Sequence, residues 1–254
     1  NLRQLGQALQ HHISVFSAVP GNGGYTGECK VKSTTDELVQ ISTEDLHAQM
    51  FFLWGVGIPG KRPAEQPGSW AYAILPYVEQ VSAYEQVDFQ TIQPQYLCPS
   101  RIRPEPQPVV DDENGRYRSG GWAWAKSDYC GNARVMPNYP YVLYLRAVTD
   151  GLSQTYAVGE KAFDPSVHTS TSWYWDEPIF SGGSKGTARA GLGVFRDGVN
   201  ITFRENWGAP HPAGAHFVIL DGSTHLVDQN IDWQVMRALL TPSGGELESA
   251  HVFK

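Results

Sequence analysis

Long apolar runs and an excess of positive charge are both missing from this chain. It has no run of about 18 consecutive apolar residues and no signal-peptide pattern, so the sequence as given predicts no membrane-spanning helix. Lys and Arg number 19 against 26 Asp and Glu, which leaves a formal net charge of −7. A nucleic-acid groove needs a basic surface that neutralises phosphates, so we expect no nucleic-acid partner.

Cysteine is scarce, with three residues in 254. Cys29, Cys98 and Cys130 form no Cys-x-x-Cys pair, so no zinc site is expected from them. We expect one disulfide bond, Cys98–Cys130, with Cys29 free. By the chain-entropy argument this bond would stabilise the fold by about 3–4 kcal/mol. The alternative is three buried thiols in a reducing compartment.

Several enzyme motifs are absent as well. The chain contains no Gly-x4-Gly-Lys-Ser/Thr, no His-Glu-x-x-His, and no Gly-x-Gly-x-x-Gly that opens a helix after a strand, so no cofactor is expected. Cys98 precedes Pro99 and has no His near it in the sequence, so the sequence does not favour a nucleophilic cysteine.

The first 140 residues combine helical patterns with loops. Apolar residues recur at spacings of three and four at the start: Leu2, Leu5, Leu9, Ile13 and Phe16. This stripe predicts an amphipathic helix over residues 1–16. Further helices are expected over 44–54 and over 70–80, where Pro76 must kink or divide the helix. Residues 17–35 and 99–121 are rich in turn-forming residues and predict loops.

After about residue 140 the pattern changes to short segments rich in β-branched and aromatic residues. Strands are expected over 141–148, 155–158, 172–175, 192–195, 199–203, 215–220 and 224–227. A last helix fits 233–240, which Pro242 and Gly244 follow. Helices first and strands later predict an α+β fold with a mostly antiparallel sheet. We expect a single domain over 1–254, with a helix- and loop-rich region at 17–140 and a β-rich part at 141–254.

A His is followed at a fixed spacing by Asp-Gly near the end of the strand-rich part, at His211 and Asp221-Gly222. A strand rises about 3.3 Å per residue, so six strand residues would hold His211 and Asp221 roughly 20 Å apart. The two side chains should therefore not share one metal ion. Asp221-Gly222 predicts instead a two-residue hairpin turn.

That turn implies a register for the two strands. Val218 would face His225 and His216 would face Val227, so His216 and His225 would share one face. We expect that face to be solvated or to form an interface. A paired-histidine metal site is the alternative, and it would need a third ligand that the sequence does not name.

Several segments of the chain occur in the same order as the sequence blocks of a known bacterial family. They are Asn1-Leu2-Arg3-Gln4-Leu5-Gly6-Gln7-Ala8-Leu9, Gly68-Ser69-Trp70 with Leu75-Pro76-Tyr77-Val78-Glu79-Gln80, Leu97-Cys98-Pro99-Ser100, Val148-Thr149-Asp150-Gly151-Leu152-Ser153-Gln154-Thr155 with Val158-Gly159-Glu160, His211 to Ser223, and Ala238-Leu239-Leu240-Thr241. Together they resemble prepilin-like (type IV pilin or pseudopilin-like) surface proteins that carry a His-x9-Asp-Gly C-terminal domain of unknown function. Residues 27–66 are longer than this family usually shows, and residues 173–175 match none of its blocks.

The resemblance implies a pilin-like architecture and a place outside the cytoplasm: extracellular, at the cell surface or in the periplasm. Members carry an apolar N-terminal helix, and here Asn1 opens directly into a helical pattern, as if an upstream segment had been removed. Contact with a membrane would run through that missing segment alone. Pilin-like partners would bind through the helix at 1–16, and a surface ligand through the loops and the exposed sheet face.

A carbohydrate-active protein on this scaffold is the alternative hypothesis. A glycosidase needs two carboxylates flanking the scissile bond, and Glu160, Asp176 and Glu177 are the candidates. Aromatic rings stack on sugar faces, so a polysaccharide would bind through a set of aromatic and histidine side chains: Trp122, Trp124, Trp173, Trp175, Trp207, His211, His216 and His225. The competing interpretation is that Trp173 and Trp175 pack in the core and that Glu160 is an ordinary strand end.

Calcium is the one metal ion that the C-terminal loops suggest. Asp228, Asn230 and Asp232 alternate as oxygen ligands do, but they lack the Gly and the distal Glu of an EF-hand. A helix cap before Trp233 is the expected role of Asp232.

Overall fold

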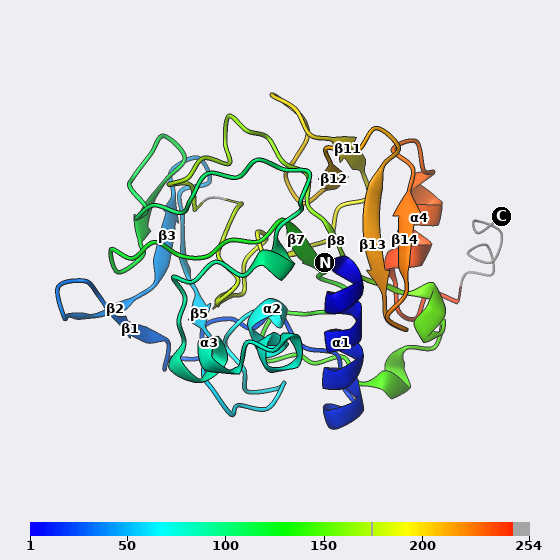
Figure 1. The fold of residues 1–254 in the computed structure, drawn as a ribbon, viewed down its shortest axis with the longest axis horizontal. Coiled ribbons are helices and arrows are strands. Elements are labelled where there is room, and N and C mark those ends of the chain that lie inside the picture. Colours follow the sequence, from blue (N-terminus) through cyan, green and yellow to red (C-terminus); the bar gives the residue numbers. More distant parts are fainter. Residues whose placement is uncertain (174, 246–254) are drawn as a thin grey trace.

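The computed structural model describes residues 1–173 and 175–245. It is an α+β fold, as expected (Figure 1). The α-helices are α1 (Leu2–Phe16), α2 (Trp70–Ala73), α3 (Val81–Gln86) and α4 (Trp233–Leu240). The 3-10 helices are η1 (Leu75–Val78), η2 (Pro94–Tyr96), η3 (Leu145–Ala147) and η4 (Leu152–Gln154). No helix in these ranges is long and apolar enough to cross a bilayer.

A five-stranded sheet forms the centre of the fold, with the order β10-β7-β8-β13-β14. Its strands are β7 (Tyr129–Asn132), β8 (Tyr156–Glu160), β10 (Ala188–Arg189), β13 (Ala215–Ile219) and β14 (Thr224–Val227). All neighbours pair antiparallel except β10 and β7, which are parallel. The sheet therefore places β8 at its middle, with its last residue, Glu160, buried between two neighbouring strands.

The described residues form four smaller sheets as well. Three are antiparallel: β1 (Lys30–Lys32) with β2 (Leu38–Gln40), β3 (Ser42–Asp45) between β4 (Met50–Leu53) and β6 (Gly115–Arg118), and β5 (Gly55–Val56) with β9 (Ser181–Gly182). The fourth pairs β11 (Val194–Arg196) in parallel with β12 (Trp207–Ala209).

Helices cover both faces of β13, which is buried along its whole apolar length. The stripe of α1 (Leu5, Leu9, Ile13) packs in one apolar cluster with Val218 of β13. On the opposite face, Phe217 and Ile219 share a second cluster with the buried side of α4. Figure 1 shows α1 lying beside β13 and α4 behind β14. This packing confirms the predicted helices at 1–16 and 233–240.

The helix expected over 44–54 is wrong, because this segment is the β3–β4 hairpin. The turn is local in origin: Asp45 Oδ1 accepts hydrogen bonds from the backbone N–H groups of His47 and Ala48, and Gln49 adopts a φ of 52°. The pairing of β3 with β6 is long-range, which no local pattern shows. Strand β6 also interrupts the loop that was expected over 99–121.

The remaining predictions divide into confirmed and wrong elements. Pro76 divides the segment 70–80 into α2 and η1, as expected. Strands 155–158, 192–195, 215–220 and 224–227 correspond to β8, β11, β13 and β14. The strands expected over 141–148 and 199–203 are wrong. The first segment contains η3 and an isolated bridge from Tyr144 to Ala18, and the second is a turn followed by irregular backbone. At 172–175, Ser172, Trp173 and Trp175 lie outside any strand, and Tyr174 lies outside the described residues.

The predicted hairpin between β13 and β14 is confirmed, but its register is wrong by one residue. Phe217, not Val218, pairs with His225, and His216 pairs with Leu226. Gly222 has a φ of +86°, and its backbone N–H donates to the carbonyl of Ile219. The loop is therefore three residues long with a left-handed glycine, and the extra residue shifts every pair that follows. His216 and His225 consequently lie on opposite faces of the hairpin.

The expected disulfide bond is absent, and all three cysteines are free and buried. The two thiols face different surroundings: Cys98 Sγ lies 3.9 Å from His211 Nε2, whereas Cys130 Sγ faces the carbonyl of Gly186 at 3.4 Å. No disulfide bond between these cysteines therefore stabilises the fold, and Cys98 has a free thiol.

Candidate functional site

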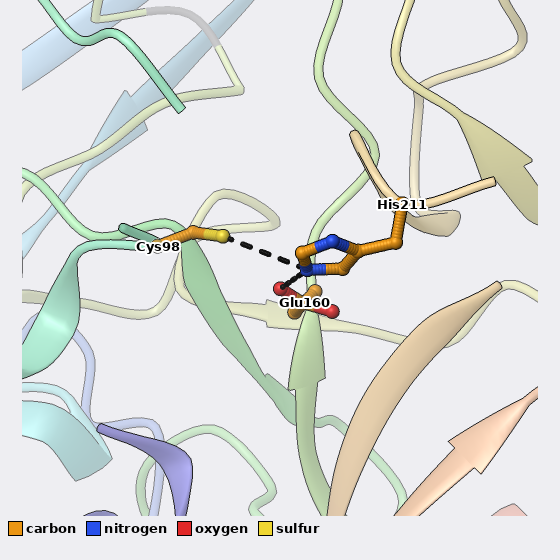
Figure 2. Close-up of side chains that lie close together, drawn as sticks. All are labelled: Cys98, Glu160 and His211. Atoms are coloured by element: carbon orange, nitrogen blue, oxygen red, sulfur yellow. Dashed lines mark hydrogen bonds and ion pairs between the residues drawn. The ribbon is translucent and has the colours of Figure 1, made fainter. Parts of the chain in front are cut away.

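Three side chains from distant parts of the chain meet at one end of the central sheet (Figure 2). Cys98 lies in the loop after η2, Glu160 is the last residue of β8, and His211 lies between β12 and β13. Their ligand atoms, one sulfur, one nitrogen and one oxygen, all lie within 4.8 Å of one another. We call Cys98, Glu160 and His211 the Cys–Glu–His cluster.

A single nitrogen atom of the histidine faces both partners. His211 Nε2 lies 3.3 Å from Glu160 Oε1 and 3.9 Å from Cys98 Sγ, as the dashed lines in Figure 2 show. Cys98 and Glu160 are buried, while about a quarter of the His211 side chain, 27 %, is exposed. The cluster therefore consists of a buried thiol and a buried carboxylate beside one partly exposed histidine.

The cluster borders a hollow of about 250 Å³. The hollow is lined by the start of α1, the Cys98–Ser100 loop, Tyr129 and His216. Asn1 Nδ2 donates to the carbonyl oxygen of Leu97 at 2.7 Å, which ties the start of α1 to the loop that carries Cys98. A ligand in this hollow would touch the helix start and the cluster together.

His216 holds the second oxygen of Glu160. Glu160 Oε2 accepts a hydrogen bond from the backbone N–H of His216 at 2.8 Å, and His216 Nδ1 lies 3.2 Å from the same oxygen. These contacts fix the carboxylate so that Oε1 points at His211. An outer partner of this kind orients a ligand without touching the bound group.

The thiol of Cys98 is held in its neutral form. Burial raises the pKa of the Cys98 thiol to about 11, and the nearby Glu160 carboxylate adds to the rise, while Arg101 opposes it. At neutral pH the sulfur therefore carries a proton and is a poor nucleophile on its own. A cation placed between the three side chains would reverse this, because a thiolate is stabilised by direct coordination.

The other two carboxylates of the carbohydrate hypothesis, Asp176 and Glu177, do not lie at this hollow. Asp176 is fully buried, where Lys161 (2.7 Å), Arg103 (3.0 Å) and Lys126 (3.4 Å) surround it, and these cations hold its pKa well below the usual range despite burial. Glu177 is buried beside a second hollow, which Trp175 also lines. Glu160 and Glu177 thus line different hollows, and no described contact pairs them across a common cleft.

Most of the aromatic candidates are packed in the interior. Trp124, Trp173 and Trp207 are at most 1 % exposed. Trp122 and Trp124 do not form an open platform, because Phe89 packs against both rings. Trp175 is half-buried. The packing interpretation therefore fits Trp173, while Trp175 borders a hollow of about 410 Å³.

The histidine and calcium candidates separate in the same way. His216 contacts Glu160 of the Cys–Glu–His cluster, whereas His225 contacts the Tyr156 ring beside a different hollow. Asp232 Oδ1 accepts from the backbone N–H of Gln234 at 2.7 Å, which confirms the expected helix cap of α4. Asp228 Oδ1 accepts from Asn230, so both side chains are used in a turn.

Ser184 adds a motif that the sequence analysis did not use. Residues 182–186 have the Gly-x-Ser-x-Gly spacing of a nucleophile elbow. The elbow places its Ser at an exposed strand-to-helix turn, but Ser184 is buried, and its hydroxyl lies 3.2 Å from Thr187 Oγ1. The next described element after β9 is strand β10, not a helix. This Ser therefore has a packing role.

Sequence reasoning singled out Glu160 and His211 for separate reasons and did not select Cys98. The signal that could have joined them is that each lies in a different block of the family resemblance: Cys98 in Leu97-Cys98-Pro99-Ser100, Glu160 in Val158-Gly159-Glu160, and His211 at the head of His-x9-Asp-Gly. Each of the three blocks supplies one side chain that can bind a metal ion.

The fold and the site define an α+β protein with an N-terminal helix on an antiparallel sheet and a Cys–Glu–His cluster at the sheet's end. Residues 1–234 match the model of the family described as protein of unknown function (DUF1559), and the chain belongs to that family. The family is associated with prepilin-like bacterial proteins. Comparison with curated proteins found no match, and comparison with solved structures found none either.

Proposed function

We propose that the chain is the globular part of a pilin-like surface protein that binds a divalent transition-metal ion, zinc above all, at the Cys–Glu–His cluster. One observation carries the proposal: a thiol sulfur, an imidazole nitrogen and a carboxylate oxygen from three separate parts of the chain lie within 4.8 Å of one another. Sulfur, imidazole nitrogen and carboxylate oxygen are the three ligand types that zinc takes in proteins.

The distances support a shared ion. In a tetrahedral zinc site, with Zn–S of about 2.3 Å and Zn–N and Zn–O of about 2.0–2.2 Å, neighbouring ligand atoms lie about 3.3–3.7 Å apart. The two distances at His211 Nε2 are 3.3 Å and 3.9 Å. The three ligand atoms lie within 4.8 Å of one another, so the Cys98 sulfur would move toward His211 and Glu160 to complete this geometry. The fourth position would open on the 250 Å³ hollow, where water or a ligand could bind.

A Cys–His–Glu catalytic triad is the competing arrangement, and the geometry disfavours it. In a triad one ring nitrogen of the His faces the nucleophile and the other faces the acid. Here Nε2 faces both Cys98 and Glu160. Burial also raises the pKa of Cys98 to about 11, whereas an activated cysteine has a lowered pKa. Both features fit a metal ligand better than a nucleophile.

Zinc titration of the reduced, chelator-treated protein tests the site. We expect one zinc equivalent to bind, and cobalt(II) substitution to give a thiolate-to-metal absorption band. Cys98→Ala, Glu160→Gln and His211→Ala should each weaken binding at least about tenfold, and Cys98→Ala should remove the band. His216→Ala should have a smaller effect, because its backbone N–H still holds Glu160.

Two controls separate the site from incidental zinc binding. Cys29→Ala removes another buried thiol, and His47→Ala removes an exposed histidine; neither side chain touches the cluster. Both variants should bind zinc as the parent protein does. Stoichiometric binding that survives His211→Ala, or binding lost equally in the controls, contradicts the proposal.

The surface location rests on family membership and on α1. The apolar face of α1 packs on the sheet, and its first residues border the metal hollow. We propose that an apolar segment joined before Asn1 continues this helix and mediates assembly with pilin-like partners, outside the cytoplasm. All three thiols are buried, which protects them from oxidation there.

Adding an apolar N-terminal segment to the chain tests the assembly part. We expect the extended chain to insert into membranes and to form oligomers. The oligomers should dissociate when the added segment is removed. A chain that carries the segment and remains monomeric in detergent and in membranes overturns this part of the proposal, while the zinc titration stays independent of it.

A further inference from the structure

A second hollow, of about 410 Å³, lies between the β3–β4 hairpin and the segment around residues 175–185. Its lining combines three aromatic side chains with two carboxylates: Phe52, Trp54, Trp175, Asp45 and Glu177. We propose that this hollow, the aromatic–acid pocket, binds a primary ammonium group of a small organic cation or of a lysine side chain.

The aromatic wall is fixed in place. Phe52 stacks on Trp54 with ring centroids 5.4 Å apart and an angle of 11° between the planes. Trp54 Nε1 donates to Thr43 Oγ1 at 2.8 Å, so the polar edge of this indole is already bonded. What remains for a ligand is apolar surface and the electron-rich faces of rings, which attract cations.

Trp175 lies on the other side and adopts a strained backbone conformation. Its φ of 59° lies in the left-handed region, which is costly for a bulky residue. Arg189 Nη2 donates to the Trp175 carbonyl oxygen at 3.1 Å and holds this conformation. Strained residues cluster at ligand-binding sites, active sites and switch regions, and Trp175 lines the pocket.

Glu177 supplies an incompletely satisfied carboxylate. Its side chain is buried, and Oε2 has no hydrogen-bond partner. Gly186 packs directly against this carboxyl group, and a Cβ at that position would overlap Oε2. Burial raises the pKa of Glu177 to about 7, and Asp176 adds to the rise, while Lys161 and Arg189 oppose it. A positive charge in the hollow that Glu177 lines would stabilise the ionised form of this carboxyl group.

The charge around the pocket favours a cation over a neutral sugar. Asp45 adds a second carboxylate to the lining, and its Oδ1 accepts hydrogen bonds from two backbone N–H groups. Lys185, the one basic residue of the lining, is 3.1 Å from Glu205 and so is already paired. A sugar hydroxyl adds no positive charge beside Glu177, whereas a primary ammonium donates hydrogen bonds and is positive.

Calorimetric titration with n-pentylammonium, against 1-pentanol as its neutral analogue, tests the proposal. We expect saturable binding of the ammonium alone. Because Glu177 titrates near pH 7 and an alkylammonium stays charged, affinity should rise about tenfold from about pH 6 to about pH 8. Glu177→Gln should abolish this pH dependence, and Glu113→Gln, at an exposed loop residue, should leave it unchanged.

Two further arms separate the sources of the ammonium group. Spermidine represents a free polyamine, and a peptide with a free Lys side chain and an acetylated N-terminus represents a protein partner; the tighter binder identifies the source. Equal binding of 1-pentanol and n-pentylammonium, saturation by neutral sugars with no response to either ammonium probe, or no saturable binding at all overturns the proposal. These outcomes do not depend on zinc, because none of the pocket residues belongs to the Cys–Glu–His cluster.

Discussion

Replacing Glu177 with Gln should change how the stability of this protein depends on pH. The carboxyl group is buried, and its pKa is raised from 4.5 to about 7. A carboxyl whose pKa is higher in the folded state favours folding when it is protonated. Its contribution is therefore complete below about pH 4.5 and is lost as the pH rises through 7.

The magnitude follows from the same pKa values. At about 1.36 kcal/mol for each pH unit, the rise from 4.5 to about 7 corresponds to about 3 kcal/mol. Gln is neutral at every pH, so Glu177→Gln should gain about 3 kcal/mol relative to the parent protein between about pH 4 and pH 8.

Urea unfolding of both proteins at several pH values measures this difference. Groups common to both proteins, such as His168, cancel in the comparison. A difference in the free energy of unfolding that stays constant with pH would refute the reasoning. It would show that Lys161 and Arg189 outweigh burial at Glu177.

Three further predictions concern packing and buried charge. Asp176→Asn should lower the free energy of unfolding by about 3–5 kcal/mol in urea melts, because Lys161, Arg103 and Lys126 lose their shared buried counter-charge. Gly6→Ala should destabilise the fold by about 1–3 kcal/mol although Ala favours helices, because its Cβ would meet the Gly222 carbonyl at 2.6 Å. A thermal melt that improves would contradict this. Burial lowers the pKa of His168 to about 3, so its contribution to stability is complete above about pH 6.5 and falls by about 4–5 kcal/mol on acidification. In melts between about pH 3 and pH 7, His168→Asn should lose less stability on acidification than the parent protein does. An equal loss in the two proteins would contradict this prediction.

The elements that the sequence predicted well are those set by local patterns. The stripe at spacings of three and four defines α1, because that face meets the sheet along its length. Asp232 defines the start of α4 by capping the backbone N–H groups of Gln234 and Val235. Both signals lie within a few residues of the element that they specify.

The elements predicted wrongly depend on contacts that are distant in the sequence. Strand β3 is stabilised on one side by β6, about 70 residues later, so a helical pattern at 44–54 was overridden by pairing. The one-residue register error at the β13–β14 hairpin came from Gly222, whose left-handed φ fits a three-residue loop as well as a two-residue turn.

The candidate site was predictable only in part. Glu160 and His211 stood out individually, one at a strand end and one in a signature. Cys98 did not, because 113 residues separate it from His211, and only the fold brings the two together. Spacing rules such as Cys-x-x-Cys detect sites whose ligands are close in sequence. No two residues of the Cys–Glu–His cluster are close in sequence, so such rules do not detect it.

X-ray absorption spectroscopy of the zinc-loaded protein tests the central claim most directly. The account predicts one sulfur ligand at about 2.3 Å, from Cys98, together with nitrogen or oxygen ligands at about 2.0–2.2 Å. In Cys98→Ala the sulfur signal should disappear, while Cys29→Ala should keep it. A zinc environment without sulfur in the parent protein, or with two sulfurs, would contradict a site built from Cys98, Glu160 and His211.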